Sequence, residues 1–178
     1  MTENPTYKYN ISLRILHWIM AIMLIGMIVS GYIMVGLNAD IAPYKWDVYG
    51  LHKSFGICFL LLSFVRIYIR LTSYIPPYKY EFSNFIKLMS GFVQKAFYVF
   101  FLAIPLTGFF SSVWAGYDIS FFGYKLPKFF AENKPFAKQA HELHEILPYV
   151  ALVFIFMHIL GVIKHRYYDK KDILDRIW

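Results

Sequence analysis

The sequence is poor in cysteine and in charge. Cys58 is the only cysteine among the 178 residues, so no disulfide can form within the chain. Charged residues make up only 16% of the chain, whereas 58% of it is hydrophobic. The mean hydropathy is +0.47, which reflects more apolar surface than a soluble domain of this length can bury. These values exclude an ordinary soluble globular protein and indicate a membrane protein.

Four apolar stretches are each close to the roughly 20 residues that a helix needs to cross a bilayer. We expect spans at approximately 13–38, 47–71, 86–117 and 142–165 of a single transmembrane domain, residues 1–178. The first stretch exceeds the roughly 7–15 apolar residues of a signal peptide, and no A-x-A-like cleavage site follows it, so we expect a retained helix. The predicted fold class is all-α, an integral membrane four-helix bundle.

The distribution of basic residues predicts the orientation. With the N-terminus inside, the inner segments hold twelve of the eighteen lysines and arginines. Basic residues concentrate on the cytoplasmic side of membrane proteins, so we expect both termini in the cytoplasm of a bacterial cell, with the chain crossing the inner membrane several times. The net charge of +7 follows from this topology and from contact with anionic membrane lipid, without any need for nucleic acid as a partner.

Four histidines fall at two depths in this topology. His144 and His158 lie fourteen residues apart, which returns to nearly the same helical face after a rise of about 21 Å. The topology places His52 level with His144 at the outer side, and His17 level with His158 at the inner side. An isolated histidine in a membrane helix is more often a polar side chain that another helix satisfies, but two depth-matched pairs favour metal ligands.

Two histidines in each layer match the two axial positions of a haem iron, whereas zinc needs three or four protein ligands. The absence of a C-x-x-C-H motif indicates non-covalent haem. The histidines therefore predict a bundle that encloses two haem b groups. Arg66 and Arg70 lie one turn apart near the inner layer, where they would contact haem propionates or else extend toward the lipid headgroups.

Two further histidines fit this scheme less directly. His141 lies one turn before His144, but the zinc motif H-E-x-x-H fails because position 145 is Glu145. A haem-free protein with an outer zinc site at His141, His144 and Glu145 remains an alternative. His165, beside two basic residues, is expected to meet solvent.

These residues resemble the bacterial cytochrome b561 family, in the four-helix branch grouped with the b-type cytochrome subunits of nickel-iron hydrogenases. The resemblance covers residues 15–169 and rests on Leu16-His17-Trp18, on His52 with Gly56 and Val65 to Arg70, on Tyr98 and Pro105 to Gly108, and on His144-Glu145 through His158 to His165. It implies one b haem on His17 and His158 and another on His52 and His144. The chain departs from the family early in the third span, where Gly91 and Gln94 replace a frequent histidine.

Within this family the chain is most similar to the small stand-alone members, among them superoxide oxidase. We therefore expect a di-haem cytochrome that transfers electrons between an outer donor, either a protein or a small molecule such as superoxide, and ubiquinone. Lysines in the long outer loop at 118–139 would attract an anionic donor, although the six positive charges of the outer segments are matched by six negative ones. The alternative is a membrane-anchor cytochrome b subunit of a larger oxidoreductase such as a hydrogenase. The sequence does not indicate an oligomeric state.

Overall fold

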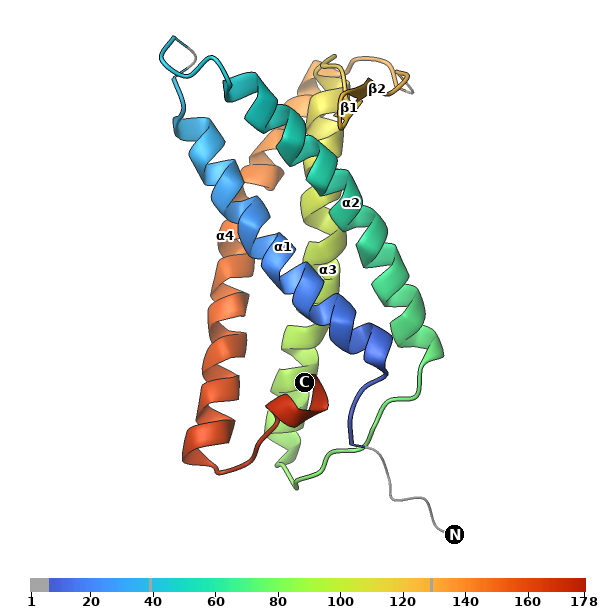
Figure 1. Ribbon diagram of the computed structural model, residues 1–178, viewed down its shortest axis with the longest axis vertical. Coiled ribbons are helices and arrows are strands. Elements are labelled where there is room, and N and C mark those ends of the chain that lie inside the picture. Colours follow the sequence, from blue (N-terminus) through green and yellow to red (C-terminus); the bar gives the residue numbers. More distant parts are fainter. Residues whose placement is uncertain (1–6, 39, 129) are drawn as a thin grey trace.

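The computed structural model describes residues 7–38, 40–128 and 130–178, and it contains four long helices that run alternately up and down (Figure 1). They are α1 (Ile11–Gly36), α2 (Lys45–Thr72), α3 (Asn84–Trp114) and α4 (Lys134–Ile163). All four are long and apolar enough to cross a membrane, which confirms the predicted all-α membrane bundle. The residues before α1 and the C-terminal segment lie at the same end of the bundle, because the backbone N–H of Tyr9 donates to the Arg176 carbonyl at 3.0 Å.

The helices begin where short polar side chains accept hydrogen bonds from free backbone N–H groups. Asn10 accepts from the backbone N–H of Ser12 at the start of α1, and Asn133 accepts from that of Phe136 at the start of α4. Because Asn133 caps the helix, α4 begins at Lys134, eight residues before the predicted span at 142. Hydropathy marks only the apolar part of this helix, and its polar first turns extend beyond it.

The loop between α3 and α4 is correspondingly shorter than predicted, and it forms a two-stranded hairpin at the end of the bundle opposite the C-terminus, the end that the distribution of basic residues predicts to be the outer one (Figure 1). Strands β1 (Ser120–Phe121) and β2 (Tyr124–Lys125) are antiparallel, with Phe121 opposite Tyr124. Phe122 and Gly123 have φ of 47° and 92°, which matches the two-residue turn that suits the twist of a hairpin. Phe129, one of the aromatic residues of the predicted outer segment, lies outside the described residues.

Ser54 attaches this hairpin to α2. Its hydroxyl is buried, accepts a hydrogen bond from the Phe122 backbone N–H at 2.9 Å, and lies 2.8 Å from the Gly50 carbonyl. The Ser120 carbonyl is also within 3.2 Å. One small polar side chain therefore holds the first strand and the start of the tight turn against α2.

The apolar side chains point mostly outward. Ile22, Val35 and Phe85 are each about 70% exposed, as expected for helices solvated by lipid. The buried apolar core is small and lies at mid-height, where Met20, Leu24 and Phe59 meet. This core separates the depth of His17 from the depth of His52.

Below the bundle, α4 continues into the π-helical turn η1 (Lys164–Tyr168) and the chain folds back to the short 3-10 helix η2 (Leu174–Arg176). The returning segment contacts the start of α1, because the indole N–H of Trp18 donates to the Ile177 carbonyl at 3.2 Å and Arg14 donates to the Trp178 carbonyl. The side chain of Arg176 also donates to the Pro76 carbonyl and faces the rings of Tyr9 and Tyr78. The C-terminal segment thus joins α1 to the loop between α2 and α3.

Candidate haem-binding sites

The two histidine pairs that the sequence analysis predicted are brought together in the structure. The ring centroids of His52 and His144 are 6.3 Å apart, and those of His17 and His158 are also 6.3 Å apart. Each pair joins helices that are not consecutive in the chain: α2 with α4 in the outer layer, and α1 with α4 in the inner layer.

This spacing fits a metal centre with two imidazole ligands on opposite sides. A metal–nitrogen bond of about 2.0 Å and about 1.1 Å from nitrogen to ring centroid, counted on both sides, add to roughly 6.2 Å between centroids. The rings of each pair are not stacked, because their planes are inclined at 78° in His52/His144 and at 55° in His17/His158. Edge-to-face ring pairs that touch directly also have centroids about 4.5–7 Å apart. The separation of 6.3 Å matches the metal-bridged value in both pairs, so it accommodates one iron atom between the rings.

Hydrogen bonds to the far side of the ring orient both outer histidines. Nδ1 of His144 donates to the backbone carbonyl of Ile104 at 2.9 Å, since a carbonyl can only accept. Nδ1 of His52 donates to the hydroxyl of Ser30 at 2.9 Å, and that hydroxyl donates in turn to the Met27 carbonyl. With the proton on Nδ1, Nε2 keeps its lone pair available for a metal, as in most histidine ligands.

Glycines allow α1 and α3 to approach the outer pair closely. A Cβ atom at Gly108 would lie 2.7 Å from Cε1 of His144, and a Cβ atom at Gly31 would lie 3.4 Å from Cε1 of His52. The first distance is well inside the roughly 3.5–4.0 Å of an ordinary carbon contact. Only glycine at position 108 therefore permits the observed position of the His144 ring.

Pro105 shapes α3 beside this pair. Proline has no backbone N–H, so the carbonyl of Phe101 one turn earlier loses its usual partner within the helix. The fully buried hydroxyl of Ser63 on α2 lies 3.1 Å from that carbonyl and 2.8 Å from the Phe59 carbonyl of its own helix, so the two carbonyls share its one hydrogen. A neighbouring helix thus brings a donor within reach of the backbone group that the proline frees, as membrane bundles require.

Arg66 lies close to the inner pair. Its Nη1 donates to the carbonyl of Leu13 at 3.2 Å, one turn before His17, and its Nε is buried without a hydrogen-bond partner among the residues that the structure describes. A buried guanidinium nitrogen without a partner suits an anionic group such as a haem propionate. Arg70 lies farther along α2 and places its guanidinium 5.7 Å from the centroid of the Tyr9 ring.

The three predicted ligands of the alternative zinc site are not brought together. His144 points into the bundle toward His52, whereas the exposed side chains of His141 and Glu145 pair with each other, with Nε2 and Oε1 3.3 Å apart. Within residues 7–38, 40–128 and 130–178, no cluster of three histidine, cysteine or acidic side chains could hold a metal ion. The geometry therefore favours pairs of axial ligands.

The outer lysines face carboxylates. Lys125 and Lys128 both contact Asp118, at 3.3 and 3.5 Å, and they lower the pKa of that carboxyl below its ordinary value. The other two lysines of this region are also close to carboxylates, with Lys134 near Glu132 and Lys138 near Glu142. These contacts leave little unbalanced positive charge to attract an anion.

Sequence reasoning missed the groups that orient the ring ligands. Ser30 and the Ile104 carbonyl carry no ligand motif of their own. Pro105 gives no signal for the Ile104 carbonyl, because the missing proline N–H frees the carbonyl of Phe101 and not that of Ile104. His165, which was expected to meet solvent, is instead largely covered, with its side chain only 13% exposed.

Comparison with known proteins agrees with this geometry. The family model described as prokaryotic cytochrome b561 matches residues 8–178. The chain is also 30% identical to cytochrome b561 homolog 2 of Escherichia coli strain K12 over 175 residues, which cover 98% of this chain and 93% of that protein.

Proposed function

The chain belongs to the prokaryotic cytochrome b561 family, and from this membership we propose that it binds two haem b groups and transfers electrons across the bacterial inner membrane. The family consists of membrane proteins that carry b-type haem and transfer electrons, and the four spans make this chain a multi-pass bacterial membrane protein.

The equal spacing of the two histidine pairs is the observation that carries the proposal. We assign His52 and His144 to the outer haem and His17 and His158 to the inner haem, because each pair is 6.3 Å apart between centroids. Haem supplies reversible one-electron exchange at these positions. Each pair would supply both axial ligands of a haem iron and leave no protein-free position for a substrate, which would suit electron transfer rather than chemistry on a bound substrate.

The remaining residues hold the ligands and separate the two layers. Ser30 and the Ile104 carbonyl keep the Nδ1 protons of the outer histidines in place. Met20, Leu24 and Phe59 form an apolar layer that excludes water and ions between the two depths. Arg66 would balance the charge of an inner haem propionate with its unpartnered Nε.

We place the electron donor at the outer end and ubiquinone in the bilayer near the inner haem. Superoxide is one candidate donor, and a protein donor is another. The pairing of the outer lysines with carboxylates argues that a small anionic donor would reach the outer haem with little electrostatic steering. Both termini lie on the inner side in this proposal, as the distribution of basic residues predicts.

Haem stoichiometry tests the ligand assignment. The purified protein should contain two haems per chain by the pyridine-haemochrome assay. Replacing His52 or His144 by alanine should remove one haem, and replacing His17 or His158 should remove the other, with different spectra for the two one-haem forms. His141→Ala is the matched control, because this exposed histidine should leave both haems in place. Full haem content in all four ligand variants would disprove the assignment.

A second measurement tests the electron transfer. Rapid mixing of the oxidised protein with superoxide or another donor should reduce both haems, and added ubiquinone should reoxidise them. Loss of either haem should stop net transfer to the quinone. Co-purification with a partner that carries another redox centre would instead favour a membrane-anchor subunit of a larger oxidoreductase.

A further inference from the structure

His165 lies at the inner end of α4, where the helix widens into the π-helical turn η1. Its side chain points inward, while the next aromatic residues, Tyr167 and Tyr168, are 65% and 83% exposed. π-Helical turns of this kind occur frequently at functional sites, because they redirect a side chain at the cost of regular hydrogen bonding. His165 therefore lies in an unusual backbone turn and is not one of the four histidines assigned as haem ligands.

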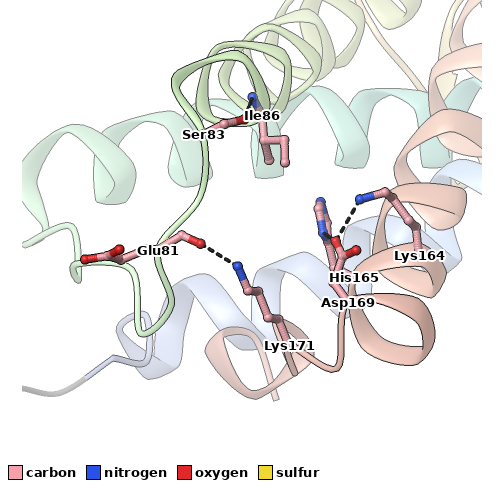
Figure 2. Close-up of polar contacts among 7 residues, drawn as sticks. All are labelled: Glu81, Ser83, Ile86, Lys164, His165, Asp169 and Lys171. Carbon is pink, nitrogen blue, oxygen red and sulfur yellow. Dashed lines mark hydrogen bonds and ion pairs between the residues drawn. The ribbon is translucent and has the colours of Figure 1, made fainter.

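A carboxylate holds one side of the imidazole. Nδ1 of His165 is 2.6 Å from Oδ2 of Asp169, and Nζ of Lys164 is 2.7 Å from the same oxygen (Figure 2). These two donors lower the pKa of Asp169, which keeps its carboxyl charged. An ionised carboxylate can only accept, so Nδ1 carries a hydrogen and Nε2 is the atom that gains or loses a proton.

The loop before α3 and the C-terminal segment cover the imidazole. The ring of Phe82 meets it edge-on with centroids 5.2 Å apart, and the backbone N–H of Lys171 donates to the His165 carbonyl at 2.8 Å. The ammonium of Lys171 donates to the Glu81 backbone carbonyl and lies 4.7 Å from the centroid of the Phe82 ring, while the Glu81 carboxylate points away (Figure 2).

The charged groups around His165 are therefore few and identifiable. Asp169 is in direct contact, Lys164 acts through Asp169, and Lys171 lies at Phe82. Arg166 is the other nearby cation, and it faces Asp172 at 3.9 Å.

His165 follows His158 by seven residues, or about two helical turns and a rise of roughly 10 Å. Low-dielectric surroundings at the end of a membrane span let charges interact over such a distance more strongly than in water. An imidazole is also the side chain that exchanges protons most readily near neutral pH. A charge on His165 and a charge at the His17/His158 centre would therefore influence each other.

We propose that His165 is a proton-binding site coupled to the redox state of the inner haem, an inference that rests on the two-haem function proposed above. His165 binds one proton at Nε2, taken from water on the inner side, when the His17/His158 centre holds one additional electron from the donor. The proton leaves when the electron leaves toward the acceptor. Charge is balanced at each step, and no bond between iron and histidine changes.

The inner midpoint potential tests this coupling. Spectroelectrochemical titration of the full protein from about pH 5 to pH 9 should show a potential that falls as the pH rises, because loss of the imidazolium charge disfavours reduction. The slope should not exceed about 59 mV per pH unit, the value for one proton per electron. The transition that remains in His52→Ala, which keeps only the inner haem, identifies the inner potential.

Two substitutions separate a proton site from a structural contact. His165→Gln should abolish the pH dependence and hold the potential near the wild-type value at high pH. Asp169→Asn should keep the pH dependence but move it to lower pH, because the imidazolium loses its carboxylate partner. Arg166→Gln and His141→Gln are matched controls for a neighbouring charge and a remote imidazole, and both should retain the wild-type slope.

The results that overturn the inference are distinct from those that overturn the function. A wild-type inner potential independent of pH, or an undiminished slope in His165→Gln, rejects the proton site while two haems remain. If His165→Gln fails to assemble, the proton site is rejected when the inner midpoint potential of Asp169→Asn has the same pH dependence as that of the wild type. Absence of the inner haem from the wild-type protein rejects the proposed function itself.

Discussion

Gly108 provides the most direct test of the outer haem site. In Gly108→Ala the added Cβ atom would lie 2.7 Å from Cε1 of His144, and 3.0 and 3.1 Å from the two ring nitrogens. An ordinary carbon contact needs about 3.5 Å, so the ring must retreat by about 0.8 Å or more. That movement stretches the 2.9 Å hydrogen bond to the Ile104 carbonyl, which comes from the same helix as the new methyl group.

The expected cost is that of an overpacked site, about 1–3 kcal/mol. At about 1.4 kcal/mol for each tenfold change, this corresponds to haem binding that is roughly 5- to 140-fold weaker at the outer site. Alanine also favours the helix over glycine by about 1 kcal/mol, in both the haem-bound and the haem-free protein. The free energy of unfolding therefore combines a loss from overpacking with a gain in helix propensity and understates the damage to the site. Haem affinity at the outer site is the appropriate measurement.

The assay is transfer of haem to an excess of a soluble haem acceptor, followed by absorption, with the two sites distinguished by the spectra of the one-haem variants. Gly108→Ala should accelerate loss of the outer haem alone. Gly31→Ala, whose Cβ would lie 3.4 Å from the His52 ring, should have a smaller effect, and Gly161→Ala, with nothing within 4 Å, should have none. A wild-type rate of outer haem loss in Gly108→Ala, or equal loss from both sites, would refute the argument.

Three further predictions concern the contacts that assemble the bundle. Ser63→Ala should destabilise the protein in a detergent unfolding titration by about 1–2 kcal/mol, because the Phe101 carbonyl freed by Pro105 loses its partner; Ser111→Ala, which removes only a bond within α3, should change stability less. Ser54→Ala should increase amide hydrogen exchange in the outer hairpin while leaving two haems bound, and unchanged exchange at Phe122 would contradict the role of its hydroxyl. Lys8 lowers the pKa of Asp175 below its ordinary value of 3.8, so their ion pair should persist at neutral pH and weaken as the pH falls through that lowered value. Amide hydrogen exchange of residues 173–178, corrected for intrinsic rates, should therefore rise at acid pH. The same rise should appear at pH 7 in Asp175→Asn.

Much of the bundle could be predicted because lipid imposes simple rules on a sequence. A span must be about 20 apolar residues long and must satisfy its own backbone groups, so helix number and type follow from hydropathy. The ends of the helices were less predictable. The start of α4 at Lys134 depends on Asn133 and on polar turns outside the bilayer, and the end of α3 at Trp114 precedes a turn in which Gly116 has φ of 88°.

The histidine pairing was also accessible, since topology assigns a depth to each residue and fourteen residues of helix measure the separation of the layers. The direction in which each ring points was not accessible. It depends on hydrogen bonds between residues as distant in the chain as Ser30 and His52, or Ile104 and His144. The burial of His165 was likewise not predictable. One of the residues that cover it, Phe82, comes from the loop before α3, and the other, Lys171, reaches it only because the chain folds back after α4.

The sequence by itself determined that this protein is a four-helix membrane bundle with paired histidines at two depths, because hydropathy, basic residues and helical periodicity are local properties that can be read along one chain. Only the tertiary structure decided that the rings of each pair stand 6.3 Å apart, that a glycine and a proline of α3 shape the outer site, and that the C-terminal segment closes over an inner histidine. These distances and contacts depend on which faces of different helices meet. Side-chain packing between segments far apart in the sequence decides which faces meet.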